Sequence, residues 1–153
     1  MKKLFLFAFL IMMTSGIKAQ VNNVTINNYT GADVYVVFYG DVATSGCTAS
    51  YTSFLKTLVG GLTGFTVNCG NTTIKNGTLT LTTGDEIVGV DVYDANPATC
   101  TPTLIGSIGE TCFSGSSSIT TPYTTYDNTC TGATINSVTW NPAGPGTATL
   151  DIN

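Results

Sequence analysis

The stretch Val34-Tyr35-Val36-Val37-Phe38-Tyr39 carries the clearest structural signal in the chain. In an extended strand, successive side chains point to opposite faces of the sheet. One face then holds Val34, Val36 and Phe38, and the other holds Tyr35, Val37 and Tyr39. Because both faces are largely apolar, we expect a strand that is either central and covered on both sides, or that presents its tyrosine-bearing face to a partner.

Alternation with a period of two also marks segments on either side of this stretch. It recurs over residues 24–27, 78–82, 88–92 and 147–152. Turn-forming Asn, Gly and Pro residues separate these segments. Counting gives eight or nine short strands, which we expect over residues 21–28, 33–40, 64–69, 77–83, 86–95, 103–108, 119–126, 133–141 and 146–152.

Helical periodicity is weak throughout the chain. Only residues 51–62 could form a helical turn, which Gly60-Gly61 would end. The last two strands are expected to form a hairpin around residues 141–146. Closely spaced strands without intervening helices are typical of sandwiches and barrels. We therefore expect an all-β fold: a single antiparallel β-sandwich, immunoglobulin-like or jelly-roll-like, supported by disulfides.

Residues 1–19 have the pattern of a secretory signal peptide. Two lysines precede an apolar run over residues 4–13, and small or polar residues lead to Ala19. The run ends well before the roughly 18 apolar residues that a membrane-spanning helix needs. We expect cleavage before Gln20, one domain over residues 20–153 and no membrane insertion afterwards. The protein is expected to be bacterial, and secreted, periplasmic or on the outer cell surface.

The expected mature chain is strongly acidic. It keeps two lysines, Lys56 and Lys75, against nine Asp and Glu residues, a formal charge of −7. Nucleic acids and anionic membranes attract proteins chiefly through Lys and Arg, so we exclude both as partners. The chain has no His and no Arg, which removes the commonest general base, the imidazole metal ligand and the bidentate anion clamp. We therefore do not expect an enzyme.

Five cysteines lie in the expected mature chain, and an oxidising compartment allows them to pair. They are Cys47, Cys69, Cys100, Cys112 and Cys130. Sequence alone cannot choose the connectivity. We favour Cys47 with Cys69 and Cys100 with Cys112, which leaves Cys130 as a free thiol. That thiol would be either buried or capped, or it would bridge to a partner or a second copy.

Carboxylates are the remaining candidates for chemistry. Asp91, Asp94 and Asn96 run from a strand into a loop, where their oxygens could hold a structural Ca²⁺. Asp91 with Asp94, or Asp85 with Glu86, could also form the two-acid pair that glycoside hydrolysis requires. The simpler interpretation is that Asp91 lies on a solvated strand face, since alternation places it opposite the neighbouring valines.

Aromatic residues are the most suggestive feature for binding. Tyr35, Tyr39, Tyr93 and Trp140 could form a platform that stacks on sugar rings or anchors a protein contact. The alternative is that Trp140 and Phe38 simply fill the core. The sequence leads us to expect an exported, non-enzymatic module for adhesion, surface binding or assembly, whose partner is a protein or glycan surface or a second copy. A lectin-like carbohydrate-binding domain is the second interpretation, and a small secreted hydrolase is the third.

Overall fold

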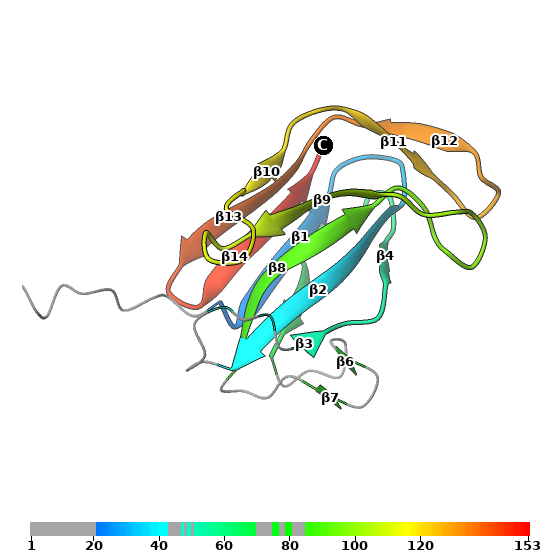
Figure 1. The fold of residues 1–153 in the computed structure, drawn as a ribbon. Helices are drawn as coiled ribbons and strands as arrows, with labels where there is room; N and C mark the ends of the chain where they lie inside the picture. Colours follow the sequence, from blue (N-terminus) through cyan, green and yellow to red (C-terminus); the bar gives the residue numbers. More distant parts are fainter. Residues whose placement is uncertain are drawn as a thin grey trace, which may run out of the picture.

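The computed structural model describes residues 21–42, 47, 49, 51–69, 75–76, 79–80 and 85–153, the two short segments 75–76 and 79–80 by their backbone only. Every regular element in this part of the chain is a β-strand, which confirms the all-β class (Figure 1). No helix among these residues is long and apolar enough to cross a membrane. The predicted signal peptide and most of the predicted strand over residues 77–83 lie outside the described residues.

Two five-stranded sheets make up most of the fold. The first sheet has the spatial order β10 (Ser118–Ile119), β13 (Val138–Gly144), β14 (Thr147–Ile152), β1 (Asn23–Asn28) and β5 (Phe65–Asn68). The second sheet contains β2 (Val34–Val42), which pairs on one side with β3 (Tyr51–Thr52) and β4 (Lys56–Leu58), and then β8 (Asp85–Tyr93) and β9 (Leu104–Gly109). The described pairs in these sheets are antiparallel, except that β1 runs parallel to β14.

Two further hairpins lie outside these sheets. They are β6 (Lys75–Asn76) with β7 (Leu79–Thr80), and β11 (Tyr123–Tyr126) with β12 (Gly132–Ile135). The β11–β12 hairpin extends to one end of the molecule, beside the loop that joins β8 to β9 (Figure 1). The predicted strands over residues 119–126 and 133–141 are therefore each divided in two. The chain leaves the first sheet, where β10 pairs with β13, to build this hairpin.

One hydrophobic core joins the inner faces of the two sheets. β2 contributes Val34, Val36 and Phe38, as alternation predicts, and β13 contributes Trp140. Phe38 and Trp140 are each 1% exposed, so both fill the core. Apolar side chains of β1, β8, β9 and β14 complete this core. The arrangement is sandwich-like, and removal of these side chains from water is its main source of stability.

A β-bulge in β8 determines which of its residues face the core. Tyr39 of β2 lies opposite Gly89, whereas Gly40 lies opposite Ile87, so Val88 is the extra residue. Ile87 therefore joins Val90 in the core although the two are three residues apart. A strict period of two would have placed Ile87 on the outer face.

The segment 51–62, predicted as a helical turn, instead forms the short strands β3 and β4 along one edge of β2. Ser53 lies between them and continues the pairing. Its backbone N–H donates to the Phe38 carbonyl at 2.8 Å, and its hydroxyl accepts from the Phe38 N–H at 2.9 Å. Bonds to β2 thus satisfy backbone groups that a helix would have paired within the segment.

The predicted disulfide pairing is wrong. The bridges join Cys47 to Cys112 and Cys100 to Cys130, with Cα–Cα distances of 5.7 and 6.1 Å, and Cys69 is the free thiol. Cys69 follows β5 and packs into the core cluster, 8% exposed. The sandwich brings together loops that are 65 and 30 residues apart in the chain. Two disulfides are consistent with an oxidising compartment.

Candidate functional site

Asp91 is hydrogen-bonded on the outer face of the second sheet rather than left to solvent. Its Oδ2 accepts from the Tyr39 hydroxyl at 2.8 Å, and its Oδ1 accepts from the Ser107 hydroxyl at 2.5 Å. The side chain is only 8% exposed. Burial, the bond to Asp91 and the charge of that carboxylate all raise the pKa of Tyr39. The carboxylate therefore ties β2, β8 and β9 together.

Phe113 covers the same outer face next to Tyr39. The two ring centroids are 5.0 Å apart. A Cβ at Gly89 or at Gly109 would collide with the Phe113 ring or with neighbouring backbone, so these glycines make room for it. Phe113 follows Cys112, whose disulfide anchors this loop to the chain beyond β2.

The four aromatic residues predicted as a stacking platform are not exposed together. Trp140 is in the core, where its Nε1–H donates to Glu110 Oε1 at 3.0 Å. Tyr35 is also fully buried, on the outer face of the second sheet. Only Tyr39 and Tyr93 are half-buried. Two of the four rings therefore cannot stack on a ligand.

The residues predicted to hold Ca²⁺ are each engaged separately. Asp91 binds hydroxyls on the sheet, Asp94 Oδ1 accepts from the Thr103 N–H at 2.6 Å, and Asn96 Oδ1 accepts from the Ala98 N–H at 3.0 Å. No three His, Cys, Asp or Glu side chains within the described ranges are grouped as metal ligands.

A pair of carboxylates that the sequence did not suggest shares one pocket. Glu86 of β8 and Glu110, just after β9, line a pocket of about 420 Å³ beside the Cys47–Cys112 disulfide. Glu86 was predicted to pair with Asp85, which is 4% exposed and does not line this pocket. Glu110 also accepts the indole hydrogen bond from the core.

An apolar groove of about 340 Å³ opens between β4 and β5, the outermost described strands on one side of the two sheets. Its floor includes the core residues Ile26 and Phe38. Phe65 lies opposite Ile26 on β1 and so faces inward, yet it is 41% exposed. Val59, on the opposite rim, is 50% exposed. An inward-facing Phe that meets water shows that the sandwich is open here.

Lys56 also lines this groove. It lies opposite Val36 in the pairing of β4 with β2, so it belongs to the inward-facing row of its strand. Inward-pointing charges on an edge strand discourage indiscriminate pairing with other strands. Lys56 places one positive charge beside a mainly apolar opening in an acidic protein.

Asn28 holds the end of the groove together. It is fully buried, and its Nδ2 donates to the carbonyls of Leu58 and Val59 at 2.9 and 3.1 Å and to that of Ala32 at 2.8 Å. Its Oδ1 accepts from the N–H and hydroxyl of Thr30. The sequence analysis placed Asn28 at the end of the predicted strand 21–28 and gave its side chain no role. A polar residue that ends an alternating strand was the signal that could have identified it.

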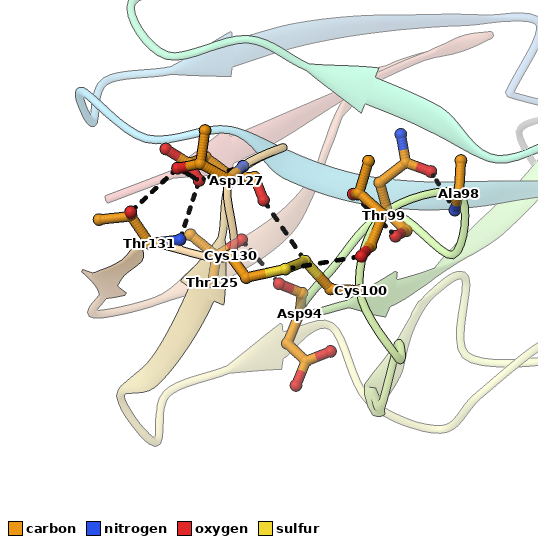
Figure 2. Close-up of a disulfide and its surroundings, with 10 residues drawn as sticks. Asp94, Ala98, Thr99, Cys100, Thr125, Asp127, Cys130 and Thr131 are labelled. Atoms are coloured by element: carbon orange, nitrogen blue, oxygen red, sulfur yellow. Dashed lines mark hydrogen bonds between the residues drawn. A yellow bond between two sulfur atoms is a disulfide. The ribbon is translucent and has the colours of Figure 1, made fainter.

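The β11–β12 hairpin is fastened over the end of the second sheet. Thr125 Oγ1 donates to the Asp33 carbonyl at 2.7 Å and approaches the Asp94 carbonyl at 3.1 Å. The Cys100–Cys130 disulfide ties the hairpin loop to the loop after β8 (Figure 2). Cys130, predicted as the free thiol, is therefore paired, and the expected intermolecular bridge through it loses its basis.

Comparison with known proteins found no matching family model, no matching curated protein and no matching solved structure.

Proposed function

We propose that this protein is an exported, non-enzymatic binding or assembly module that takes up an extended segment of another protein in the groove between β4 and β5. The observation that carries the proposal is the 41% exposure of Phe65, although it faces inward beside the buried Ile26. Apolar side chains exposed in a groove are favourable sites for burial by a partner.

The strands that flank the groove indicate what kind of segment could occupy it. Within the described strands, β5 pairs only with β1, and β4 pairs only with β2. Neither has a second strand partner among these residues, so the outer side of each is a candidate edge for pairing with an added strand. Alternate side chains of such a strand would point into the groove toward Ile26 and Phe38. The occupant is therefore an extended segment with apolar residues at every second position.

Charge selects further among such segments. Lys56 is the only Lys or Arg whose side chain is described, and it lines the groove. An Asp or Glu on the incoming strand can pair with it, whereas a strand with Lys or Arg there would be repelled. The other two candidate functions have less support: burial of Tyr35 and Trp140 removes half of the proposed sugar platform, and hydrogen bonds already occupy Asp91.

The test uses the mature chain and synthetic peptides of about ten residues, enough to span one strand. One peptide alternates Val or Ile with Thr and carries one Asp; a scrambled peptide of the same composition is the control. Fluorescence polarisation measures binding, and hydrogen exchange measures protection of the β4 and β5 amides. We expect the alternating peptide to bind at least tenfold more tightly than the scrambled one.

The matched variants are Phe65→Glu at the groove and Tyr29→Glu outside it, where Tyr29 is 61% exposed. Phe65→Glu should weaken peptide binding at least tenfold, and Tyr29→Glu should leave it unchanged. Thermal unfolding of both variants checks that they are folded. Equal binding of both peptides, or full binding by a folded Phe65→Glu protein, would refute the proposed function.

A further inference from the structure

β5 has a regular outer edge with two residues whose backbone groups point away from β1. Its antiparallel pairing with β1 keeps one register throughout. The Cys69 N–H extends this ladder by donating to the Asn22 carbonyl at 2.9 Å. In an antiparallel ladder, residues that bond to the neighbour alternate with residues whose N–H and C=O point away from it. Thr66 and Asn68 therefore point outward, and among the described residues no hydrogen bond outside the β1 pairing involves either N–H group.

The other edge of the groove, formed by β3 and β4, is irregular. Tyr39 of β2 lies opposite Thr52, whereas Val36 lies opposite Lys56, so one extra residue makes a bulge between β3 and β4. A bulge disrupts the regular row of backbone groups and is a common protection of an edge strand. β6 also lies close to β3 (Figure 1). Only the short strand β4 is left for pairing on this side.

β4 turns the backbone groups of only one residue outward. The Phe38 N–H and C=O both bond to Ser53, so alternation along β2 turns Val36 toward β4 as well. Lys56, opposite Val36, then bonds to β2, and Thr57 is the residue that points outward. One outward residue supports fewer hydrogen bonds to an added strand than the two of β5.

From this comparison we infer that the incoming segment adds to β5 as an antiparallel sixth strand of the first sheet, and not to β4. The inference rests on the proposed function, since it assigns the pairing edge of the same segment. Antiparallel pairing is slightly more stable per residue than parallel pairing. The residues of the segment opposite Thr66 and Asn68 bond to them and turn their side chains to the outer face. The residues between them lie in the row of Phe65 and Val67, which line the groove.

Lys56 determines where an acidic residue of the segment belongs. It lines the groove from β4, across from Phe65 and Val67 on β5. A carboxylate can therefore reach its amine from the row of the segment that faces the groove, whereas the outer row points away from it. The segment that fits has a polar outer row and an apolar inner row that contains one Asp or Glu.

Peptides with a single N-methyl group test the pairing mode. In the alternating peptide, antiparallel addition to β5 makes the Thr residues donate to the sheet and turns the N–H groups of Val and Ile away from it. N-methylation of a central Thr should weaken binding at least tenfold. N-methylation of a neighbouring Val or Ile should change binding by less than about threefold. The reverse pattern would overturn the antiparallel arrangement.

Thr66→Pro and Thr57→Pro are the matched variants of the two edges. Both residues are exposed, and proline on the outward side of an edge strand removes one N–H without breaking the existing ladder. Thr66→Pro should weaken peptide binding at least tenfold, and Thr57→Pro should bind as the parent does. Thermal unfolding checks that both variants are folded.

Hydrogen exchange of single amides, measured by NMR in the parent protein, needs no variant. Saturating peptide should slow exchange at Thr66 and Asn68 at least tenfold and leave Thr57 unchanged. Full binding by a folded Thr66→Pro protein, or protection of Thr57 without Thr66, would overturn the inference but leave the groove as a binding site. Equal binding of the alternating and scrambled peptides by the parent would instead refute the proposed function, and the inference with it.

Discussion

Replacing Asn28 by Ala should separate the two sheets at the end of the groove. The side chain is fully buried and bonds the end of β1 to the carbonyls of Leu58, the last residue of β4, and of Val59, which follows it. Alanine keeps the strand but removes both the donor and the acceptor. The Leu58 carbonyl would remain in a buried region, so its desolvation would no longer be offset by a hydrogen bond.

The magnitude follows from the number of bonds lost. Nδ2 carries two N–H groups, shared among three carbonyls, and Oδ1 accepts two further bonds from Thr30. Four protons are therefore involved, at about 1 kcal/mol each, so the free energy of unfolding should fall by about 4 kcal/mol. For a domain of this size, that corresponds to a fall in Tm of roughly 12 to 16 °C.

Asn27→Ala is the matched control. Asn27 donates to Asp151 at 2.8 Å and accepts from the Gly64 N–H at 2.9 Å, but it is only half-buried, so its loss should cost about 1 kcal/mol. Urea unfolding followed by the fluorescence of Trp140, the single tryptophan, measures both variants. A difference between them of less than 1 kcal/mol would refute the reasoning, since the bonds of Asn28 would then contribute no more than exposed ones. Asn28→Ala should also weaken peptide binding at the groove.

Three further predictions concern the core and the bridges. Burial raises the pKa of Cys69 to about 12, whereas the thiol ionises near pH 9 in the unfolded chain. The free energy of unfolding should therefore fall as the pH rises from 9 toward 12. Urea unfolding at each pH should show a less steep fall in Cys69→Ala. An equal slope in both proteins would contradict this. Gly89→Ala should lower the free energy of unfolding by about 2 to 3 kcal/mol, because the added methyl group would collide with the Phe113 ring. An unchanged Tm would contradict this packing. Replacing both Cys100 and Cys130 by Ser should lower the free energy of unfolding by about 3.5 kcal/mol, because the bridge closes a loop of 30 residues. A value from urea unfolding within 1 kcal/mol of that of the parent would contradict this.

The faces of β2 could be predicted because alternation is a local property. Phe38 reaches the core and Tyr39 the outer face, as the sequence indicates. The bulge at Val88 could not be predicted, because it depends on how β8 is matched to its neighbour. The segment 51–62 was misread for the same reason: its structure follows from pairing with β2, which overrides a weak local preference.

The candidate site was predicted less well than the fold. Alternation placed Asp91 on the outer face, but it could not reveal that Tyr39 and Ser107 from the adjacent strands would bond to it. The groove is open because β4 and β5 lie at the edges of the two sheets. The exposure of Phe65 therefore depends on the strand order, which local sequence patterns do not reveal. The disulfides likewise depend on distances between loops, which no spacing of cysteines in the chain encodes.

The parallel pairing of β1 with β14 has a consequence for how this chain comes to be folded. Asn27 and Asp151 are 124 residues apart, and β1 occupies the place between β14 and β5. Contacts between such distant positions form slowly, because the long chain segment between them must close into a loop before these contacts stabilise the sheet. The first sheet therefore cannot be completed until the last strand has been synthesised. If the protein is exported as proposed, the first sheet would be completed only after β14 has crossed the membrane.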